Sequence, residues 1–569
     1  MLCSTKPARF WEGNKVGPQE FYPDAGTPPS SDGDGRRSGR DSAPRNPAVK
    51  GAADLKSAGL HARNGQSWES SRVPILDEES FRQKIIEECS RGARLVNLFA
   101  CPAGGGACPE DSGDVRVFVM LGKDQEGKIS VFSMRILSDK SSFRSLTPEL
   151  PQAHMFEREI AEQFAVTPAG HPWLKPVRYH QNYRNVADLW PEVALRPVPG
   201  VYPFYRVEGE EAHEVAVGPV HAGIIEPGHF RFQCHGEEVL NLEIQLGYQH
   251  RGIEKMMEEV PAERAVLLAE SIAGDTVIAH VMAYCHIMES LSDCEISPRA
   301  QAIRAIALEL ERLSNHIGDL GALSTDIGFS PPAAYFGRLR GEFLNLLMEL
   351  SGNRYGRSLC RPGGVLFDLD QKMAEDFRQR LLIARKDLKG ISDLFWGSSS
   401  VLSRLEGTGT VSNQAAKELG LVGPAARASG IGVDVRTDYA FGMYRFHYIP
   451  VSTASSGDVH ARALVRWLEA QRSIEFLLDV LSRIPQGDLR VKVPALKPDH
   501  MALAMVEGWR GEIVHVAITD ARAGIARYKI KDPSFHNWTG LAMAARGGQI
   551  SDFPLCNKSF NLSYAGHDL

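Results

Sequence analysis

The sequence has no cysteine pair of the kind that holds a metal or an iron–sulfur cluster. Nine cysteines are scattered over 569 residues, and none of them forms a C-x-x-C motif. A zinc ribbon and a cluster-binding run are therefore both excluded. Cys101 and Cys108 flank a Gly-rich stretch, for which a flexible loop and a redox pair remain as alternatives. We expect the cysteines to be mostly free thiols in a reducing cytoplasm.

Long uncharged hydrophobic runs are also missing. The longest apolar run, residues 265–288, is interrupted by four ionisable residues: Glu270, Asp275, His280 and His286. We therefore expect a buried helix there rather than a membrane span. Residues 1–20 carry charges without an apolar stretch, so no secretory signal is predicted. Attachment to a membrane must then come through partner subunits, which predicts a peripheral position on the cytoplasmic face.

The charge balance gives no reason to expect a nucleic-acid partner. The formal net charge is -6, and 24% of the residues are charged, which is ordinary for a globular protein. A chain of 569 residues is too long for one ordinary domain, so two or three folded units are expected.

Composition divides the first part of the chain. Residues 1–70 are rich in Gly, Ser, Pro, Asp and Arg, and such a segment cannot offset the entropy of ordering, so we expect a disordered extension. Residues 71–185 carry an amphipathic pattern at 78–91 and strand-like patterns at 115–121 and 129–136. This order predicts a small α/β domain.

A Pro-rich linker over residues 186–210 leads into a second domain over residues 211–569. Its first element is a predicted β-hairpin at 230–246, in which apolar and polar residues alternate on the second strand, so we expect its apolar face to be buried. Helical spacing dominates beyond it, with Ser297 as the N-cap of one helix and another helix over 460–484. The fold class is thus an α/β domain followed by a mainly α-helical α+β domain with an N-terminal β-hairpin.

Two motifs close the predicted α/β domain. Residues 154–164 read HMFEREIAEQF, and residues 169–174 read AGHPWL. The pair resembles the E-R-E…F…G-H-P-x-L signature of the small α/β subunit in the peripheral arm of complex I, and of the matching domain in formate hydrogenlyase-type hydrogenases. An amphipathic helix followed by a turn would explain each piece alone, but it would not explain their order.

Six further segments occur in the order found in the large subunit shared by complex I and group-4 [NiFe] hydrogenases. They are GPVH at 218–221, EPGHFR at 226–231, YQHRGIEK at 248–255, ELERLSNH at 309–316, RPGGV at 361–365 and RASG at 427–430. The chain therefore resembles a fused small-plus-large subunit, and the [NiFe]-hydrogenase-large-subunit fold is expected for its second domain.

The resemblance also shows where hydrogenases place the four thiolates that hold nickel and iron. Those positions fall here on four residues without sulfur: Ala273, Thr276, Ser563 and Gly566. Soft sulfur ligands are what such a metal pair requires, so no metal and no hydrogenase activity are expected. In the complex I homologue the vacated cavity ends a quinone tunnel, whose tyrosine position matches Gly274 and whose loop histidine matches His229. Cys556 is expected to be a buried thiol.

Ionisable residues remain beside these positions, and two interpretations of them stay open. Buried groups of this kind either pair for structural reasons or carry protons. Structural pairing is favoured for Arg251 and Glu254, whereas the candidate catalytic residues are Asp275, His280 and His229. On an ideal helix Asp275 and His280 point about 140° apart. We therefore expect Asp275 to face the cavity and His280 to face a neighbouring helix.

A fused subunit that lacks the metal ligands resembles the corresponding subunit of the energy-converting-hydrogenase-related complexes. The resemblance implies an iron–sulfur small subunit with a [4Fe–4S] cluster and ion-translocating membrane subunits as partners, with no cofactor bound by this chain itself. Electrons from NADH or ferredoxin would reach a quinone or another acceptor, and their transfer would drive ion movement. The alternative is a non-catalytic coupling scaffold. A cavity between residues 271–280 and 556–569 would favour the first hypothesis, and a filled core the second.

Overall fold

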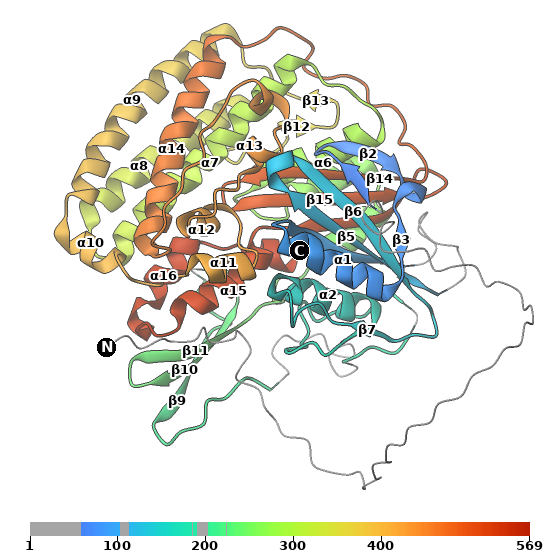
Figure 1. Cartoon of the computed structure of the whole chain (residues 1–569). Helices are drawn as coiled ribbons and strands as arrows, with labels where there is room; N and C mark the ends of the chain where they lie inside the picture. Colours follow the sequence, from blue (N-terminus) through green and yellow to red (C-terminus); the bar gives the residue numbers. More distant parts are fainter. Residues whose placement is uncertain (1–58, 103–112, 185, 191–202, 224) are drawn as a thin grey trace, which may run out of the picture. The chain divides into compact units, whose positions relative to one another are not determined.

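The α/β region is built on a largely antiparallel sheet beside two helices (Figure 1). The computed structural model describes residues 59–102, 113–184, 186–190, 203–223 and 225–569. The five strands of this sheet are β1 (Leu60–Ala62), β3 (Ile75–Leu76), β4 (Arg94–Pro102), β5 (Val115–Lys123) and β6 (Lys128–Ile136). Helix α1 (Glu78–Ser90) packs on β5 and β6, so the predicted helix and strands are present.

Helix α2 (His154–Phe164) coincides with the first signature motif, and every one of its residues is buried. It packs against β4 and is followed by β8 (Thr167–Ala169), which pairs in parallel with β7 (Ser142–Arg144). Glu157, on α2, accepts hydrogen bonds from Leu146 N at 2.6 Å and from the hydroxyl of Thr147 at 2.6 Å. The motif therefore fixes the helix to the chain that precedes it.

The predicted extension ends earlier than expected. Residues 1–58 lie outside the described residues, but residues 60–69 contain β1 and β2 (Gln66–Glu69), so disorder up to residue 70 was wrong for them. Strand β1 pairs with β6, and β2 pairs with β14 (His500–Gly508) near the other end of the chain. The residues from 59 to 569 form one compact unit.

The hairpin that opens the second region is present, in a three-stranded sheet. Its strands are β9 (Ala212–Val217), β10 (His229–His235) and β11 (Glu238–Gln245). The predicted burial of its apolar face was only partly right, because Leu240 is exposed and the polar Glu243 is buried. Lys175 explains the buried carboxylate, since its ammonium lies 2.6 Å from Glu243 Oε1.

Four long helices lie side by side (Figure 1). They are α7 (Pro298–Asp326), α8 (Ser330–Ser351), α9 (Gln371–Trp396) and α14 (Val459–Ser482). The Ser297 hydroxyl caps α7 by accepting a hydrogen bond from Ala300 N at 3.1 Å, as the sequence predicted. The shorter helices are α4 (Ile253–Glu259), α5 (Ala262–Ala269), α6 (Val277–Leu291), α10 (Ser399–Leu405), α11 (Asn413–Glu418), α12 (Gly423–Ala428) and α13 (Val435–Asp438).

The apolar run at 265–288 is two helices, not one. Helix α5 ends at Ala269 and α6 begins at Val277, which leaves residues 270–276 in a connecting segment. Helix α6 packs on β14 and β15. None of the helices within the described residues is long and apolar enough to cross a membrane.

A buried antiparallel sheet, which the sequence did not predict, forms the floor under α6. Its order is β16-β15-β14-β2, with β15 at Gly511–Thr519 and β16 at Ile525–Lys531. Strand β15 is buried along its whole length. The chain closes with α15 (Ser534–Ala545), α16 (Phe553–Phe560) and α17 (Tyr564–Asp568), and a short β12–β13 pair lies at Cys360–Arg361 and Gly364–Val365.

Candidate functional site

The two segments that the sequence analysis predicts to match the early and late metal-ligand motifs, residues 271–280 and 552–566, lie next to each other. Arg251 joins them through its guanidinium, which donates to Ser271 O at 2.6 Å, to Ile272 O at 2.8 Å and to Ala565 O at 3.5 Å. One segment leads into α6 and the other leads into α17. The residues between them form the candidate site.

Arg510 occupies the space between these segments. It comes from the tight turn that joins β14 to β15, and its side chain is 4% exposed. Its Nη1 lies 2.6 Å from Asp275 Oδ1 and its Nη2 lies 2.8 Å from Asp275 Oδ2, a bidentate ion pair. Its Nε donates to Asn561 O at 2.5 Å. One cation thus binds both segments.

The hydroxyl at one former ligand position is fully engaged. Thr276 is 1% exposed and stands immediately before α6. Its Oγ1 donates to Asp275 Oδ1 at 3.0 Å and accepts hydrogen bonds from Trp509 Nε1 at 3.1 Å and Arg510 Nη1 at 3.0 Å. Its hydroxyl therefore holds the ion pair in place.

The two positions in the late segment, Ser563 and Gly566, are also occupied by contacts within the protein. Ser563 caps α17, because its Oγ accepts a hydrogen bond from Gly566 N at 2.8 Å. A Cβ on Gly566 would lie 2.7 Å from Asp532 Oδ2, so no side chain fits there. Ala273 is buried, but Gly274 is exposed and a Cβ on it would meet nothing within 4 Å. The site is filled at its floor and open at Gly274.

These residues do not fit a nickel–iron centre. The four positions offer two hydroxyls that already bond within the protein and no sulfur, and a guanidinium lies between them. Over the part of the chain that the structure describes, no cluster of three or more His, Cys, Asp or Glu side chains could hold a metal. Cys556 is buried and free, and burial raises the pKa of its thiol.

Asp275 does not lie on a helix, so the expected helical angle to His280 does not apply. Its carboxylate is 35% exposed at the edge of the site. Burial raises the pKa of the Asp275 carboxyl, but the Arg510 guanidinium outweighs this effect and holds the pKa below its usual value. Asp275 is therefore an ionised, partly exposed carboxylate at the edge of the site.

Two further carboxyl groups flank the site, and neither of them was among the predicted site residues. Glu311, on α7, caps α6: it accepts hydrogen bonds from Ile278 N at 2.6 Å and Ala279 N at 3.2 Å, while burial raises its pKa to about 8. Glu226 accepts a hydrogen bond from Tyr564 N at 3.2 Å, and burial raises its pKa. Their places within the ELERLSNH and EPGHFR segments were the only signals that could have marked them.

His280 lies behind the floor of the site rather than on it. Its Nε2 lies 3.1 Å from Asp532 Oδ2, the oxygen that abuts Gly566, and its Nδ1 lies 3.2 Å from His515 Nε2. His515 Nδ1 in turn lies 2.9 Å from the hydroxyl of Tyr528. His280 and Asp275 face different neighbours, but the expected helix beside His280 was wrong, because its ring contacts His515 on β15 and Asp532 directly after β16.

His229 is not assembled with the other candidate residues. Its Nδ1 donates to Gly218 O at 3.1 Å, its Nε2 accepts from Arg231 at 3.1 Å, and burial lowers its pKa. Among the described residues, no hydrogen bond or ring contact joins His229 to Asp275 or His280. Since Gly274 also lacks the tyrosine ring, the quinone clamp implied by the complex I resemblance is not formed by these two residues.

Arg251 and Glu254 are paired structurally, but with other groups. Arg251 binds the backbone carbonyls described above. Glu254 is buried and accepts from Lys529 at 2.9 Å and from Arg527 at 3.2 Å, which together hold its pKa far below its usual value although burial raises it. His250 lies 2.9 Å from Asp568 O, with its ring stacked on His180. These contacts tie α4 to β16 and to the C-terminal residues.

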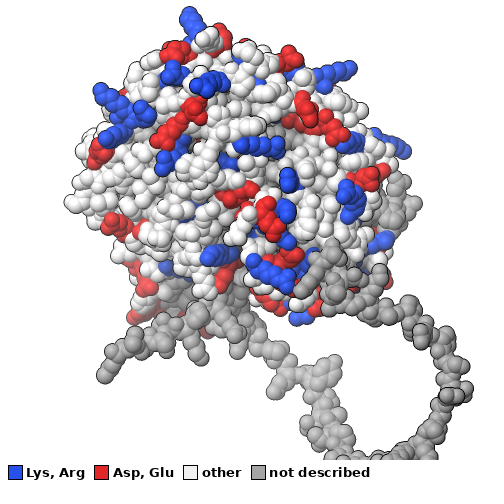
Figure 2. Space-filling model, turned by 45° about the horizontal axis from the view of Figure 1, so that its top comes forward, with Lys and Arg blue, Asp and Glu red and all other residues white. Residues whose placement is uncertain are grey.

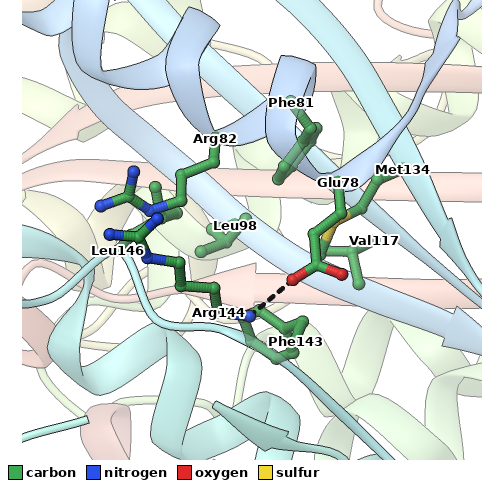
Figure 3. A pocket seen from close by; sticks show the side chains of 9 residues that line it. All are labelled: Glu78, Phe81, Arg82, Leu98, Val117, Met134, Phe143, Arg144 and Leu146. Carbon is green, nitrogen blue, oxygen red and sulfur yellow. Dashed lines mark hydrogen bonds between the residues drawn. The ribbon is translucent and has the colours of Figure 1, made fainter. Parts of the chain in front are cut away.

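The two described pockets lie elsewhere. One lies between α6, α7 and the residues around Phe441. The other lies between α1 and the N-terminal sheet, and Figure 3 shows the side chains that line it, among them Arg82 and Arg144. Figure 2 shows Lys and Arg interspersed with Asp and Glu, so the described part of that face carries no large patch of one sign.

Two family models match the chain. The model described as respiratory-chain NADH dehydrogenase, 49 Kd subunit, matches residues 326–502 and 494–568, and the model described as the 30 Kd subunit matches residues 95–191. The second match covers α2 and its signature. The first covers Arg510, Asp532 and the late segment of the site.

Curated relatives show the same two relationships. Formate hydrogenlyase subunit 5 of Escherichia coli K12 is 28% identical over 470 residues, 80% of this chain and 82% of that protein. The carbon monoxide-induced hydrogenase of Rhodospirillum rubrum is 31% identical over 351 residues, 61% of this chain and 97% of that protein. NADH-quinone oxidoreductase subunit 4 of Thermus thermophilus is 29% identical over 369 residues, 60% of this chain and 90% of that protein.

Proposed function

This chain belongs to the family of fused 30 kDa and 49 kDa complex I subunits, related to formate hydrogenlyase subunit 5 and hydrogenase-4 component G, and from this premise we propose that its altered site reduces an acceptor other than protons. The chain is a subunit of a complex I-like or energy-converting-hydrogenase-related oxidoreductase complex. In the proposal it lies peripherally on the cytoplasmic face of a membrane, beside a [4Fe–4S] subunit and ion-translocating subunits.

The observation that carries the proposal is the Asp275–Arg510 pair at the place of the metal ligands. A quinone that accepts two electrons also takes up two protons, and its oxygens carry negative charge between these events. Arg510 supplies a fixed positive charge that stabilises such an oxygen. Asp275 is partly exposed beside the open position at Gly274, so its carboxylate can take up a proton from water and pass it to a bound acceptor.

The roles follow from position. Electrons from NADH or ferredoxin enter through the iron–sulfur subunit, and the acceptor binds over Gly274 rather than inside the filled floor. Thr276 and Trp509 orient the pair by their hydrogen bonds to its two residues and to the Asp275 backbone. Reduction and protonation there change the charge around Arg510, which is the event that would be coupled to ion movement.

A non-catalytic coupling scaffold remains the second candidate, and one observation favours it. Arg510 bonds Asp275, Thr276 and Asn561 at once, so it fills the space between the two segments. A locked site of this kind could transmit movement between partner subunits without binding an acceptor. The two candidates differ in whether electrons leave the complex through this chain.

The intact complex distinguishes them. Purified complex is supplied with NADH or reduced ferredoxin, and reduction of a soluble quinone is followed together with hydrogen release. We expect the complex to reduce the quinone without releasing hydrogen. We also expect the same activity in membrane fractions. Hydrogen release would overturn the proposal, and electron uptake without reduction of any quinone would favour the scaffold.

A further inference from the structure

One face of helix α7 contacts the early segment, the late segment and the turn between β14 and β15. Glu311, Asn315 and Asp319 are spaced four residues apart, so they lie along one side of the helix, over a length of about 12 Å. All three are at most 9% exposed. Glu311 caps α6, and the other two side chains bind the segments on either side of Arg510. A short stretch of one helix therefore sets where these segments lie.

Asn315 binds the early segment. Its amide nitrogen donates to the backbone oxygen of Asp275 at 3.0 Å and to that of Glu311, one turn earlier in α7, at 2.9 Å. Both partners are carbonyl oxygens, so only the nitrogen of the amide can face them. The Asp275 carboxylate is bound to Arg510, so Asp275 is held by α7 at its backbone and by the guanidinium at its side chain.

Asp319 binds the late segment in a corresponding way. Its Oδ1 accepts a hydrogen bond from Asn561 Nδ2 at 2.5 Å, and its Oδ2 accepts one from Arg466 Nε at 2.6 Å. The backbone oxygen of Asn561 accepts the hydrogen bond from Arg510 Nε. Asn561 is therefore held by α7 at its side chain and by the guanidinium at its backbone.

The turn that carries Arg510 is also bound to α7. Arg312 is fully buried and donates to Gly508 O at 2.9 Å and to Glu507 O at 2.5 Å, directly before that turn. The contacts thus form a closed circuit from α7 through the early segment, the guanidinium and the late segment back to α7. A guanidinium is planar and its donors point at fixed angles, so its bonds to both segments need a fixed separation between them.

The charges of the circuit favour the same arrangement. Burial lowers the pKa of the Arg510 guanidinium, but nearby carboxylates, Asp275 foremost and Asp319 among them, raise it above its usual value. Asp319 thus stabilises the Arg510 cation as well as the segment that this cation binds.

We propose that Asn315 and Asp319 are positioning residues of the acceptor site, an inference that rests on the proposed function. They act through other residues, because Asn315 fixes the backbone of Asp275 and Asp319 fixes the late segment. Arg510 then meets Asp275 in one bidentate geometry, which places the carboxylate and the positive charge beside an acceptor over Gly274. A displacement of about 1 Å in such a group can lower a rate by about 10²-fold.

Truncation of Asn315 tests the early half of the circuit. Asn315→Ala removes the bond to Asp275 and the bond to the helix's own carbonyl at Glu311. Ser324→Ala is the matched control, because Ser324 is also buried and its hydroxyl donates to Leu320 O of the same helix at 2.8 Å. Acceptor reduction by the assembled complex is expected to fall by about 10- to 10²-fold in Asn315→Ala and to stay at the wild-type rate in Ser324→Ala. A wild-type rate in Asn315→Ala, or an equal fall in both variants, would overturn the proposal.

An exchange of two side chains tests the late half. Asp319→Asn and Asn561→Asp each remove the hydrogen bond between the two positions, because two amides or two carboxylates then face each other. In the double variant the amide on α7 donates to the carboxylate, so the bond returns in the opposite direction. Asp tolerates the left-handed backbone at residue 561, whose φ is 46°.

We expect each single variant of this exchange to reduce the acceptor about 10-fold more slowly than wild type, and the double variant to regain most of the lost rate. Such a rescue separates the bond itself from the mere presence of a polar group on α7. A double variant no faster than the single variants, or single variants at the wild-type rate, would contradict the role of Asp319.

A second measurement does not depend on turnover. Hydrogen–deuterium exchange of the assembled complex, followed by mass spectrometry, reports how firmly residues 270–276 are held. Their exchange is expected to become faster in Asn315→Ala and to be unchanged in Ser324→Ala. Unchanged exchange in Asn315→Ala would rule out the positioning role. A complex that reduces no acceptor but shows the faster exchange would contradict the proposed function alone.

Discussion

Removal of the Arg510 guanidinium should destabilise the fold at the site itself. Arg510→Met keeps a long apolar side chain and removes the bonds to Asp275, Thr276 and Asn561. Breaking a buried ion pair costs about 3–5 kcal/mol, because the remaining charge is left without its partner. Asp275 is 35% exposed, so water screens part of that cost, and we expect about 3 kcal/mol.

The expected shift in melting temperature is small but measurable. Unfolding entropy is about 2.1 cal/mol/K per residue, which gives roughly 1 kcal/mol/K for a unit of about 500 residues. A loss of about 3 kcal/mol therefore lowers the melting temperature by about 3 °C. Calorimetry at one scan rate on wild type, Arg510→Met, Asp275→Asn and the double variant measures it.

The double variant decides whether the pair acts as a unit. If Asp275 and Arg510 stabilise each other, the double variant should lose less than the sum of the two single losses, because no unpaired charge remains. Losses that add without coupling, or a melting temperature of Arg510→Met equal to that of wild type, would refute the description of this pair as the centre of the site.

Three other outcomes follow from the contacts. Gly566→Ala should lower the free energy of unfolding by about 1–3 kcal/mol through overpacking, and Gly274→Ala should leave it almost unchanged. Denaturant unfolding measures both changes. Equal effects would contradict the description of a filled floor with an open edge. Between about pH 4.5 and 8 the Glu311 carboxyl is neutral in the folded protein and charged in the unfolded protein. The wild type should therefore lose stability as pH rises through that window, whereas Glu311→Gln should not. A difference in melting temperature between wild type and Glu311→Gln that stays constant with pH would contradict this. Removal of residues 1–69 should lower the melting temperature, because it removes β1 and β2 with the buried ring of Trp68. An unchanged melting temperature would instead support the prediction of a disordered extension up to residue 70.

Local signals in the sequence were sufficient for several elements. The signature at 154–164 delimits α2, and Ser297 with its following proline marks the start of α7, because caps and helical spacing act within a few residues. The sheet escaped prediction because its two central strands, β14 and β15, are buried on both faces. Such strands show no alternation of polar and apolar residues, and their pairing with β2 spans most of the chain.

The site depends on contacts between residues far apart in sequence. The motifs predict the metal-ligand positions, and the sequence itself shows that these four residues carry no sulfur. Arg510 and Asp275 are 235 residues apart, and His280 and His515 are also 235 residues apart, so no local pattern pairs them. Asp275 was placed on a helix because the apolar run continues through it, whereas Glu311 and Trp509 fix the backbone there and let α6 begin only at Val277.

The rate at which the intact complex carrying Asp275→Asn reduces a soluble quinone tests the central claim most directly. This change keeps the shape of the side chain and its bond to Arg510 but removes the group that exchanges a proton beside Gly274. We expect turnover to fall by about 10²- to 10⁴-fold while the complex still assembles, as is typical when acid–base catalysis is lost. A fully assembled variant that turns over at the wild-type rate would contradict the claim and leave Asp275 with a structural role.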